Sequence, residues 1–294
     1  MRDLKRDTEG SDKMSFNDVL MQIAARCANN FEMEAGDYKK DGLIYCGKCH
    51  TPRQARIDLG NGVMFEPPSL CKCREAERDR EKAADKARKK ALENERMRRR
   101  CIRDEKLLKF TFENDLQPDS KYTAIFKRYC DKWEQIKADN IGLVLYGEKG
   151  RGKSFYAGCI CNRLISMGVK AYAISEPNII NELFERTDKA AYISRLARYP
   201  MLLIDDLGAA RATEYSREQI YTIIDERYKA NLPTIFTTNL TPQQFDSPAS
   251  IAEGRIYDRI KAMGQFIEIK GKNWRQDEAS QKAAAFIEIM NGGD

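Results

Sequence analysis

The sequence of 294 residues contains no long apolar run. Its most apolar stretches, such as residues 141–146, are far shorter than the roughly 20 residues that a membrane-spanning helix needs. The first five residues, Met-Arg-Asp-Leu-Lys, also lack the apolar core of a secretory signal. We therefore expect a cytoplasmic protein with no membrane partner, whose nine cysteines are thiols or metal ligands and not a disulfide framework.

Histidine is nearly absent, since His50 is the only one. It completes a Cys-x-x-Cys-His pattern that begins at Cys46 and is typical of covalent haem attachment. We reject haem, because this attachment normally needs export and would leave Cys71 and Cys73 unexplained. Together with Cys49, these cysteines form two knuckles whose four thiolates suit a tetrahedral structural Zn²⁺. The second knuckle has one intervening residue where two are usual, and four unrelated buried thiols are the alternative.

Glycine and proline are absent from residues 74–106, which are rich in Ala, Glu, Lys and Arg. This composition predicts a helix. The segment holds fourteen Lys/Arg against nine Asp/Glu, and so most of the net charge of +6. We interpret it as a solvated connector helix. The alternative is that its arginines contact nucleic-acid phosphates, through Arg96, Arg98, Arg99, Arg100 and Arg103.

Composition and patterning divide the chain into four parts. Residues 1–14 are polar, and residues 15–27 have apolar side chains at helical spacing. That short helix packs on its own domain or docks on a partner protein. The predicted parts are an N-terminal tail with this helix (residues 1–40), a zinc-binding module (41–73), a charged helical linker (74–106) and an ATPase domain (107–294).

From residue 107 onward, apolar segments alternate with helical ones. Five segments have the length and composition of buried strands, namely residues 141–146, 169–175, 201–205, 234–239 and 266–270. Helices are predicted between them, notably over residues 153–167 and 216–229. This order predicts an α/β fold with a parallel five-stranded sheet and helices on both of its faces.

A phosphate-binding loop follows the first of these strands. It matches the P-loop pattern at every fixed position, with Gly147, Glu148, Lys149, Gly150, Arg151, Gly152, Lys153 and Ser154. Its glycines let backbone N–H groups point at phosphate oxygens, and the helix that follows adds the positive end of its dipole. We expect Lys153 to reach the β- and γ-phosphates of ATP and the Ser154 hydroxyl to bind Mg²⁺.

Polar residues end the third and fourth predicted strands. Asp205 and Asp206 follow an apolar run, and we expect Asp205 to bind Mg²⁺ and Asp206 to polarise the attacking water. Asn239 is placed to orient that water. Arg255 and Arg259 lie four residues apart on one predicted helix face, and each is a candidate for charge stabilisation or an ordinary surface ion pair.

Together these motifs resemble the DnaC/DnaI type of AAA+ ATPase, the replicative helicase loaders of bacteria and phages. The resemblance covers residues 107–276 and rests on segments 110–114, 142–147, 203–208, 237–240 and 255–259, and on Trp274 with Arg275. The two cysteine knuckles resemble the zinc-binding modules of loaders in Gram-positive bacteria and their phages. The sequence does not distinguish a chromosomal protein from a phage or prophage one, and we favour the latter.

The resemblance implies roles for four side chains. Asn239 matches sensor 1, Arg275 matches sensor 2, and Arg259 matches the arginine finger that completes a neighbouring subunit's site, with Arg255 as its companion. It also implies ATP-dependent self-assembly and binding to a hexameric replicative helicase, which the loader places on single-stranded DNA.

The chain departs from the usual pattern at Asp206, where a glutamate is common, and the shorter carboxylate suggests slow, switch-like hydrolysis. The family also places DNA contacts before the third strand, here within residues 178–198, at Arg186, Lys189, Arg195 and Arg198. Three other functions stay open: an IstB-like ATPase helper of transposition, a small-molecule P-loop kinase, and a zinc-dependent DNA-binding module.

Overall fold

The computed structural model describes residues 33–58, 64–210 and 213–291. The chain divides into two compact units, Met1–Lys90 and Ala91–Asp294. The helix predicted over residues 15–27 lies outside the described residues. Residues 91–106, which the sequence analysis assigned to the linker, belong to the second unit, which therefore begins before residue 107.

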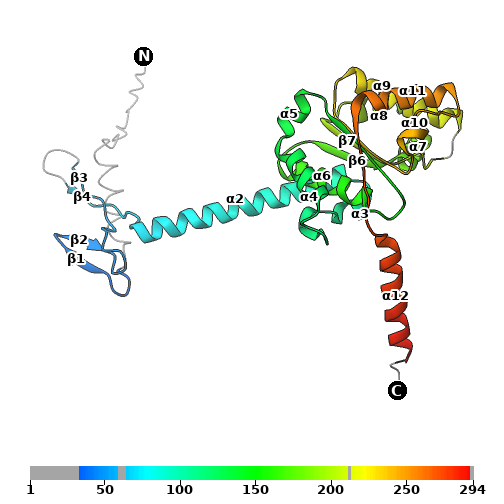
Figure 1. The fold of residues 1–294 in the computed structure, drawn as a ribbon. Helices are drawn as coiled ribbons and strands as arrows, with labels where there is room; N and C mark the ends of the chain where they lie inside the picture. Colours follow the sequence, from blue (N-terminus) through cyan, green and yellow to red (C-terminus); the bar gives the residue numbers. More distant parts are fainter. Residues whose placement is uncertain (1–32, 59–63, 211–212, 292–294) are drawn as a thin grey trace, which may run out of the picture. The chain divides into compact units, whose positions relative to one another are not determined.

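The described part of the first unit is built from two small hairpins (Figure 1). Strand β1 (Tyr38–Lys40) pairs with β2 (Leu43–Tyr45), and β3 (Ile57–Asp58) pairs with β4 (Met64–Phe65), both antiparallel. The β1–β2 turn is Asp-Gly at residues 41–42, with φ of 53° and 82°. Positive φ at both central residues is typical of the type I′ turn that suits a two-residue hairpin.

Helix α2 (Lys72–Cys101) is the predicted charged helix, and it ends before residue 106. One side of its last turn packs on the second unit, since Cys101 is buried and Arg98 is half-buried. The Arg98 guanidinium donates to Asn162 Oδ1 at 2.6 Å and to the carbonyl of Leu108. Beyond the helix end, Ile102 forms a parallel bridge with Ala173. Arg98 is therefore a packing residue of the second unit, which argues against the alternative that it contacts nucleic-acid phosphates.

The second unit contains a parallel five-stranded sheet, as predicted, and its strand order is β6-β7-β8-β5-β9. Its strands are β5 (Gly142–Tyr146), β6 (Ala171–Ser175), β7 (Met201–Leu207), β8 (Thr234–Thr238) and β9 (Gly264–Glu268). The last strand begins earlier than the predicted residue 266. Gly264 allows this, because a Cβ there would lie 2.7 Å from a Val144 methyl group.

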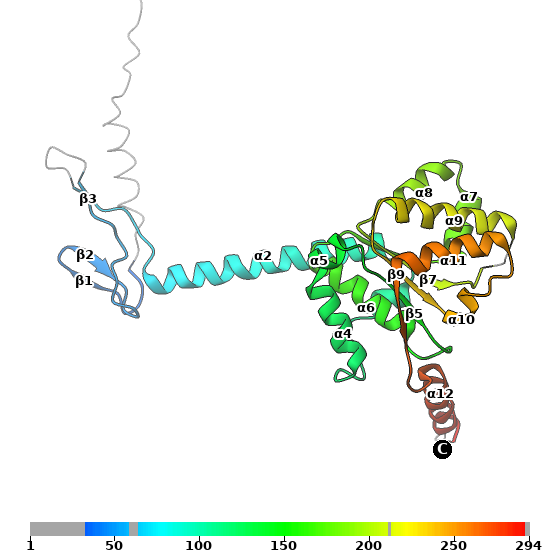
Figure 2. The same cartoon turned by 45° about the horizontal axis from the view of Figure 1, so that its top comes forward.

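Helices cover both faces of this sheet, as predicted (Figure 2). Helix α6 packs along one face, with α3 and α4 against its outer side, and α7, α9 and α11 pack on the other face with α8 against α9. Their bounds are α3 (Glu105–Lys109), α4 (Lys121–Asp131), α5 (Trp133–Ala138), α6 (Lys153–Ser166), α7 (Glu176–Glu185), α8 (Lys189–Ala197), α9 (Glu214–Lys229), α10 (Pro242–Phe245) and α11 (Ile251–Met263).

Two further helical segments complete the described chain. A single 3₁₀ turn, η1, covers Phe112–Asn114, and helix α12 (Trp274–Asn291) follows the last strand and has no buried residue. No helix in the described part of the chain is both long and apolar enough to cross a membrane.

Arg227, on α9, is completely buried in the second unit. Its guanidinium donates to carbonyls at the end of α8, at Leu196, Ala197 and Tyr199, and to the Pro233 carbonyl at 2.6 Å. Burial lowers the pKa of this group to about 9. A buried cation is tolerated when hydrogen bonds replace its water shell, and here one side chain joins α8, α9 and the start of β8.

Candidate functional site

The predicted phosphate-binding loop connects β5 to α6, the context that the pattern requires. Three of its glycines have positive φ, namely Gly147 (139°), Gly150 (79°) and Gly152 (94°). At Gly147 a Cβ would also lie 2.7 Å from the Ile269 carbonyl oxygen. Side chains at these glycine positions would therefore disrupt the backbone conformation of the loop. The loop lies directly before the N-terminus of a 14-residue helix.

Lys153 is buried at the first position of α6. Its ammonium donates to the carbonyls of Gly147 and Glu148 and to Asn239 Oδ1, each at 2.8 Å. Burial lowers the pKa of Lys153, while the charge of Asp206 opposes the shift. The structure thus brings the loop lysine together with the sensor 1 candidate, which lies directly after β8 and is exposed.

Asp205 and Asp206 both lie within β7, at its carboxyl end. Asp205 is buried and accepts a hydrogen bond from the Thr237 hydroxyl. Burial raises the pKa of Asp205, and hydrogen bonds from Thr237 and Ser154 oppose that shift. The Ser154 hydroxyl and this carboxylate are the two oxygen groups that would hold Mg²⁺, which supplies Lewis-acid neutralisation of phosphate charge when bound.

Asp206 has a left-handed backbone, with φ of 53°, where non-glycine residues are uncommon. Its N–H donates to Thr237 Oγ1 at 2.9 Å. Thr237 therefore holds both aspartates, since its hydroxyl also donates to Asp205. The sequence analysis included Thr237 only within the segment 237–240. Its position directly beside the two aspartates on the neighbouring strand is a tertiary feature.

Arg151, at a loop position that commonly holds a small residue, has two partners. It forms an ion pair with Glu148 and donates to the Gly271 carbonyl. A further contact joins the same segments, because the Trp274 N–H donates to the Gly150 carbonyl at 3.0 Å. These bonds fasten the loop to the segment before α12.

The exposed Arg275 lies on the first turn of α12. Its charge is close enough to lower the pKa of Lys153, after the larger effect of burial. The sensor 2 candidate is therefore electrostatically coupled to the loop lysine of its own chain.

Within this chain, Arg259 contacts residues of α9 and not the phosphate-binding loop. Its Nε donates to Asp225 Oδ1 at 2.9 Å, and its guanidinium lies 4.8 Å from the centre of the Tyr228 ring. Arg255, its companion on α11, is exposed. Arg259 thus contacts α9, and the loop, the two aspartates and Asn239 form a separate site.

Glu176 is a buried residue of this region that the sequence analysis missed. It accepts a hydrogen bond from the Gly208 N–H, directly after β7. Burial raises its pKa, while backbone hydrogen bonds from residues 208–210 oppose the shift. Glu176 thereby holds the loop that follows the two aspartates. No local pattern identifies such a residue.

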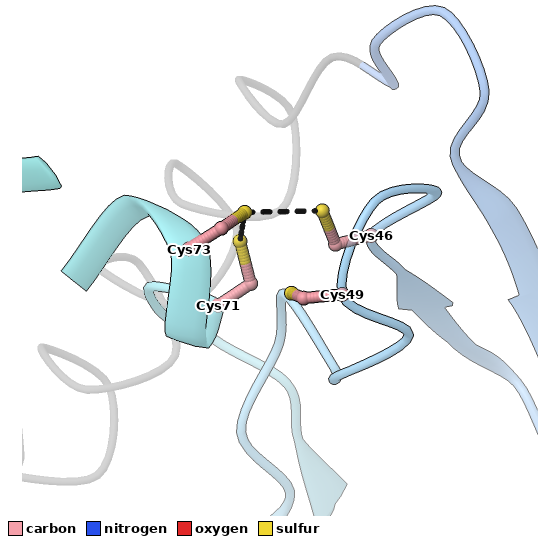
Figure 3. Close-up of side chains that lie close together, drawn as sticks. All are labelled: Cys46, Cys49, Cys71 and Cys73. Atoms are coloured by element: carbon pink, nitrogen blue, oxygen red, sulfur yellow. Dashed lines mark hydrogen bonds between the residues drawn. The ribbon is translucent and has the colours of Figure 1, made fainter. Parts of the chain in front are cut away.

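The four cysteines predicted to bind a metal come together in the first unit (Figure 3). Cys46 and Cys49 follow β2, and Cys71 and Cys73 lie at the start of α2. All four sulfurs lie within 4.8 Å of one another, with Cys73 at 3.5 Å from Cys46 and 3.3 Å from Cys71. Four thiolates at about 2.3 Å from one Zn²⁺ would have similar spacings. The cluster can therefore hold a metal ion.

Hydrogen bonds favour the thiolate form in part of the cluster. The Thr51 hydroxyl lies 3.0 Å from the sulfur of Cys49 and lowers its pKa to about 5. His50 is directed elsewhere, since its Nδ1 lies 3.3 Å from the Tyr38 hydroxyl. Within the described residues, the group that could hold a metal ion thus consists of four sulfurs and no histidine.

Several proteins of named function are similar in sequence to this chain. The replicative helicase loader DnaI of Bacillus subtilis is 26% identical over 184 residues, which are 58% of this chain and 59% of that protein. The replicative helicase loader DnaC of Escherichia coli is 23% identical over 44% of this chain and 53% of its own length. An insertion-sequence putative ATP-binding protein of Geobacillus stearothermophilus is 25% identical over 46% of this chain and 56% of its own length.

The chain therefore spans less than two thirds of the length of each of these relatives. Among solved structures, a crystal structure of DnaI is 27% identical with a TM-score of 0.49 and covers 59% of this chain and 95% of that one. A family model described as IstB-like ATP binding protein matches residues 74–282, which is more than half of the chain. The protein belongs to the IstB-like ATP-binding protein family.

Proposed function

We propose that this protein is an ATPase that loads a replicative helicase onto single-stranded DNA. The observation that supports this most directly is the assembled nucleotide site. The loop lysine, the buried Asp205 and Asn239 meet at the carboxyl edge of the sheet, as an ATP-dependent switch requires. The similarity to DnaI and DnaC supports the choice of a helicase as partner.

The site can couple ATP to binding through Lys153. In this structure its three N–H donors contact two loop carbonyls and Asn239. A γ-phosphate would compete for the same ammonium and would free the Asn239 amide to orient water beside Asp206. The presence of the γ-phosphate would thus change the hydrogen bonding of Asn239. A switch needs a local change of this kind.

The direct test uses purified full-length chain and the purified replicative helicase of the same source. We expect an affinity that differs at least about fivefold between ATP and ADP, the lower end of ordinary coupling between two ligands. Equal affinity in both nucleotides, or no complex in either, would lead us to abandon the loader function.

The second candidate is an ATPase helper of DNA transposition. The family description and the similarity to the insertion-sequence protein favour it, and the ATPase core of the two candidates is alike. A parallel binding assay with the transposase of a neighbouring gene separates them. Nucleotide-dependent binding to the transposase in place of the helicase would establish the second candidate.

We also propose that the four-cysteine cluster binds one structural Zn²⁺ and that the small unit contacts the partner protein. We expect Cys46→Ser to reduce the zinc content from about one ion per chain to near zero, because a structural site needs all four ligands. The second unit should stay folded. Zinc is measured by mass spectrometry of metals, with Cys101→Ala in the other unit as the control. Equal zinc in Cys46→Ser and the wild type would remove Cys46 from the ligand set.

A further inference from the structure

Thr237 is a buried polar residue of the ATPase unit to which the sequence analysis assigned no role. It lies on β8, which pairs with β7 on one side and with β5 on the other. Its side chain is completely buried. A buried hydroxyl costs free energy unless hydrogen bonds satisfy it, so the partners of Thr237 indicate what the residue does.

The Thr237 hydroxyl is bonded to two consecutive residues of β7. It donates to Asp205 Oδ1, and it accepts a hydrogen bond from the Asp206 N–H at 2.9 Å. A hydroxyl has one hydrogen to donate, and here that hydrogen is directed at the Asp205 carboxylate while the oxygen holds the backbone of Asp206. The two bonds therefore fix the hydroxyl between the two aspartates.

The pairing of β7 with β8 is irregular beside this hydroxyl. The register shifts between residues 204 and 207 of β7, so that two residues of β7 lie opposite one residue of β8. The two are Asp205 and Asp206, and the one is Thr237. On its other side β7 stays regular, since Asp205 pairs with Ser175 of β6. Such a β-bulge redirects side chains, and bulges are frequent next to active sites.

The bulge requires an unfavourable backbone at Asp206. Its φ of 53° is left-handed, and a residue with a side chain keeps that conformation only when its surroundings hold it. The Asp206 N–H bonds to the Thr237 side chain, where a strand residue ordinarily bonds to main chain. Glu176 holds the segment that follows, through its bond from the Gly208 N–H. Thr237 thus fixes the bulge itself, and Glu176 fixes its exit.

The bulge matters because the two carboxylates have to serve one site. In a regular strand, consecutive side chains point to opposite faces of the sheet, so adjacent aspartates would diverge. Here both act on the loop lysine, since burial lowers the pKa of Lys153 while the charges of Asp206 and Asp205 oppose that shift. The irregular pairing is therefore the feature that allows two neighbouring acids to act at the same phosphate-binding region.

We propose that Thr237 is a positioning residue of the ATPase site, which clamps the β-bulge so that Asp205 is held for Mg²⁺ and Asp206 for the attacking water. The proposal rests on the ATPase activity within the proposed function for the roles of the two aspartates. Thr237 acts through them, and no chemical step is assigned to its own hydroxyl.

The test variant is Thr237→Val, which keeps the volume of the side chain but neither donates nor accepts a hydrogen bond. Thr237→Ser keeps the hydroxyl and should restore the wild-type behaviour. The matched control is Thr238→Val, which removes the next hydroxyl of the same strand. That hydroxyl is also buried, and it bonds only to main-chain groups, of Leu207 and Leu240.

The first measurement is the ratio of ATP affinities with Mg²⁺ and with EDTA, obtained by calorimetric titration. We expect Thr237→Val to lower this ratio at least about fivefold, the effect of one ordinary hydrogen bond, because the Asp205 carboxylate is no longer held. Its affinity in EDTA should match the wild type, since the bonds of Lys153 do not involve Thr237. Thr237→Ser and Thr238→Val should both keep the wild-type ratio.

The second measurement is the rate of single-turnover hydrolysis at saturating ATP and Mg²⁺. We expect Thr237→Val to lower the rate about 10²-fold, the lower end of what a positioned proton acceptor contributes. Thr237→Ser should recover most of the rate. Thermal unfolding curves show whether each variant keeps its fold. If Thr237→Val does not fold, Thr237→Ala takes its place, because it puts no γ-methyl group beside the two carboxylates.

A folded Thr237→Val chain with the wild-type affinity ratio and rate would overturn the proposal. An equal loss in Thr238→Val, or a loss that Thr237→Ser does not restore, would also overturn it, because either result assigns the effect to the packing of β8. Failure of the loader function gives a different result. A wild-type chain that binds and hydrolyses ATP but forms no complex with the helicase would defeat that function and leave the role of Thr237 standing.

Discussion

Replacing Lys153 with alanine should abolish ATP binding at ordinary concentrations, with a loss of at least about 100-fold in affinity. A hydrogen bond to a charged group contributes about 1.5–3 kcal/mol, and the loop lysine is expected to make two with the β- and γ-phosphates. The structure supports this estimate, because the Lys153 ammonium is buried at the loop and its three donors already converge on loop and sensor groups.

Calorimetric titration with ATP and Mg²⁺ provides the measurement. The control is Lys137→Ala, which removes the same charge from an exposed position on α5 and should bind ATP normally. A thermal unfolding curve shows whether the variant keeps its fold, since the lost bonds to Gly147 and Glu148 also support the loop. ATP affinity equal to that of the wild type in a folded Lys153→Ala variant would contradict the site.

Local patterns predicted the nucleotide loop because its chemistry is encoded in consecutive residues. The glycines that the motif requires coincide with positive φ at Gly147, Gly150 and Gly152. The parallel sheet was predictable for a similar reason, since each strand is a short apolar run between helices. The strand limits were less accurate, because the start of β9 depends on how closely Gly264 approaches Val144 and not on its own sequence.

Contacts between distant segments were not predictable in this way. Thr237 holds both aspartates from the neighbouring strand, and Arg227 joins three segments from a completely buried position. An arginine in the last turn of a polar helix looks like a surface residue in the sequence. Arg98 is a similar case, because only the folded chain shows that it contacts Asn162 on α6.

Arg259→Ala should leave ATP affinity nearly unchanged and reduce ATP hydrolysis by about 10³ or more, the ordinary contribution of an arginine finger. Within one chain, Arg259 contacts Asp225 and the Tyr228 ring, so its removal leaves the contacts of Lys153 intact. Steady-state phosphate release with full-length protein, at saturating ATP, measures the rate. Arg259→Lys should stay far below wild type, because an ammonium lacks the planar fork of the guanidinium.

The position of Arg259 makes a sharper test possible. If the finger acts on a neighbouring subunit, a mixture of two inactive variants should recover hydrolysis. A chain with Lys153→Ala still offers Arg259, and a chain with Arg259→Ala still has an intact loop. In an equal mixture with random head-to-tail contacts, about a quarter of the interfaces combine the two intact halves. We expect the activity of the mixture to approach that fraction of the wild-type rate.

Recovery distinguishes a finger from a structural arginine. If Arg259 only supported α9 through Asp225, its loss would inactivate the chain that carries the substitution. Mixing with Lys153→Ala chains could then not restore hydrolysis at the loop of that chain. A mixture as inactive as its components would therefore remove the shared site from the proposed mechanism, while wild-type hydrolysis by Arg259→Ala alone would remove the finger. Recovered activity should also depend on total protein concentration, because the active site then exists only where two chains meet.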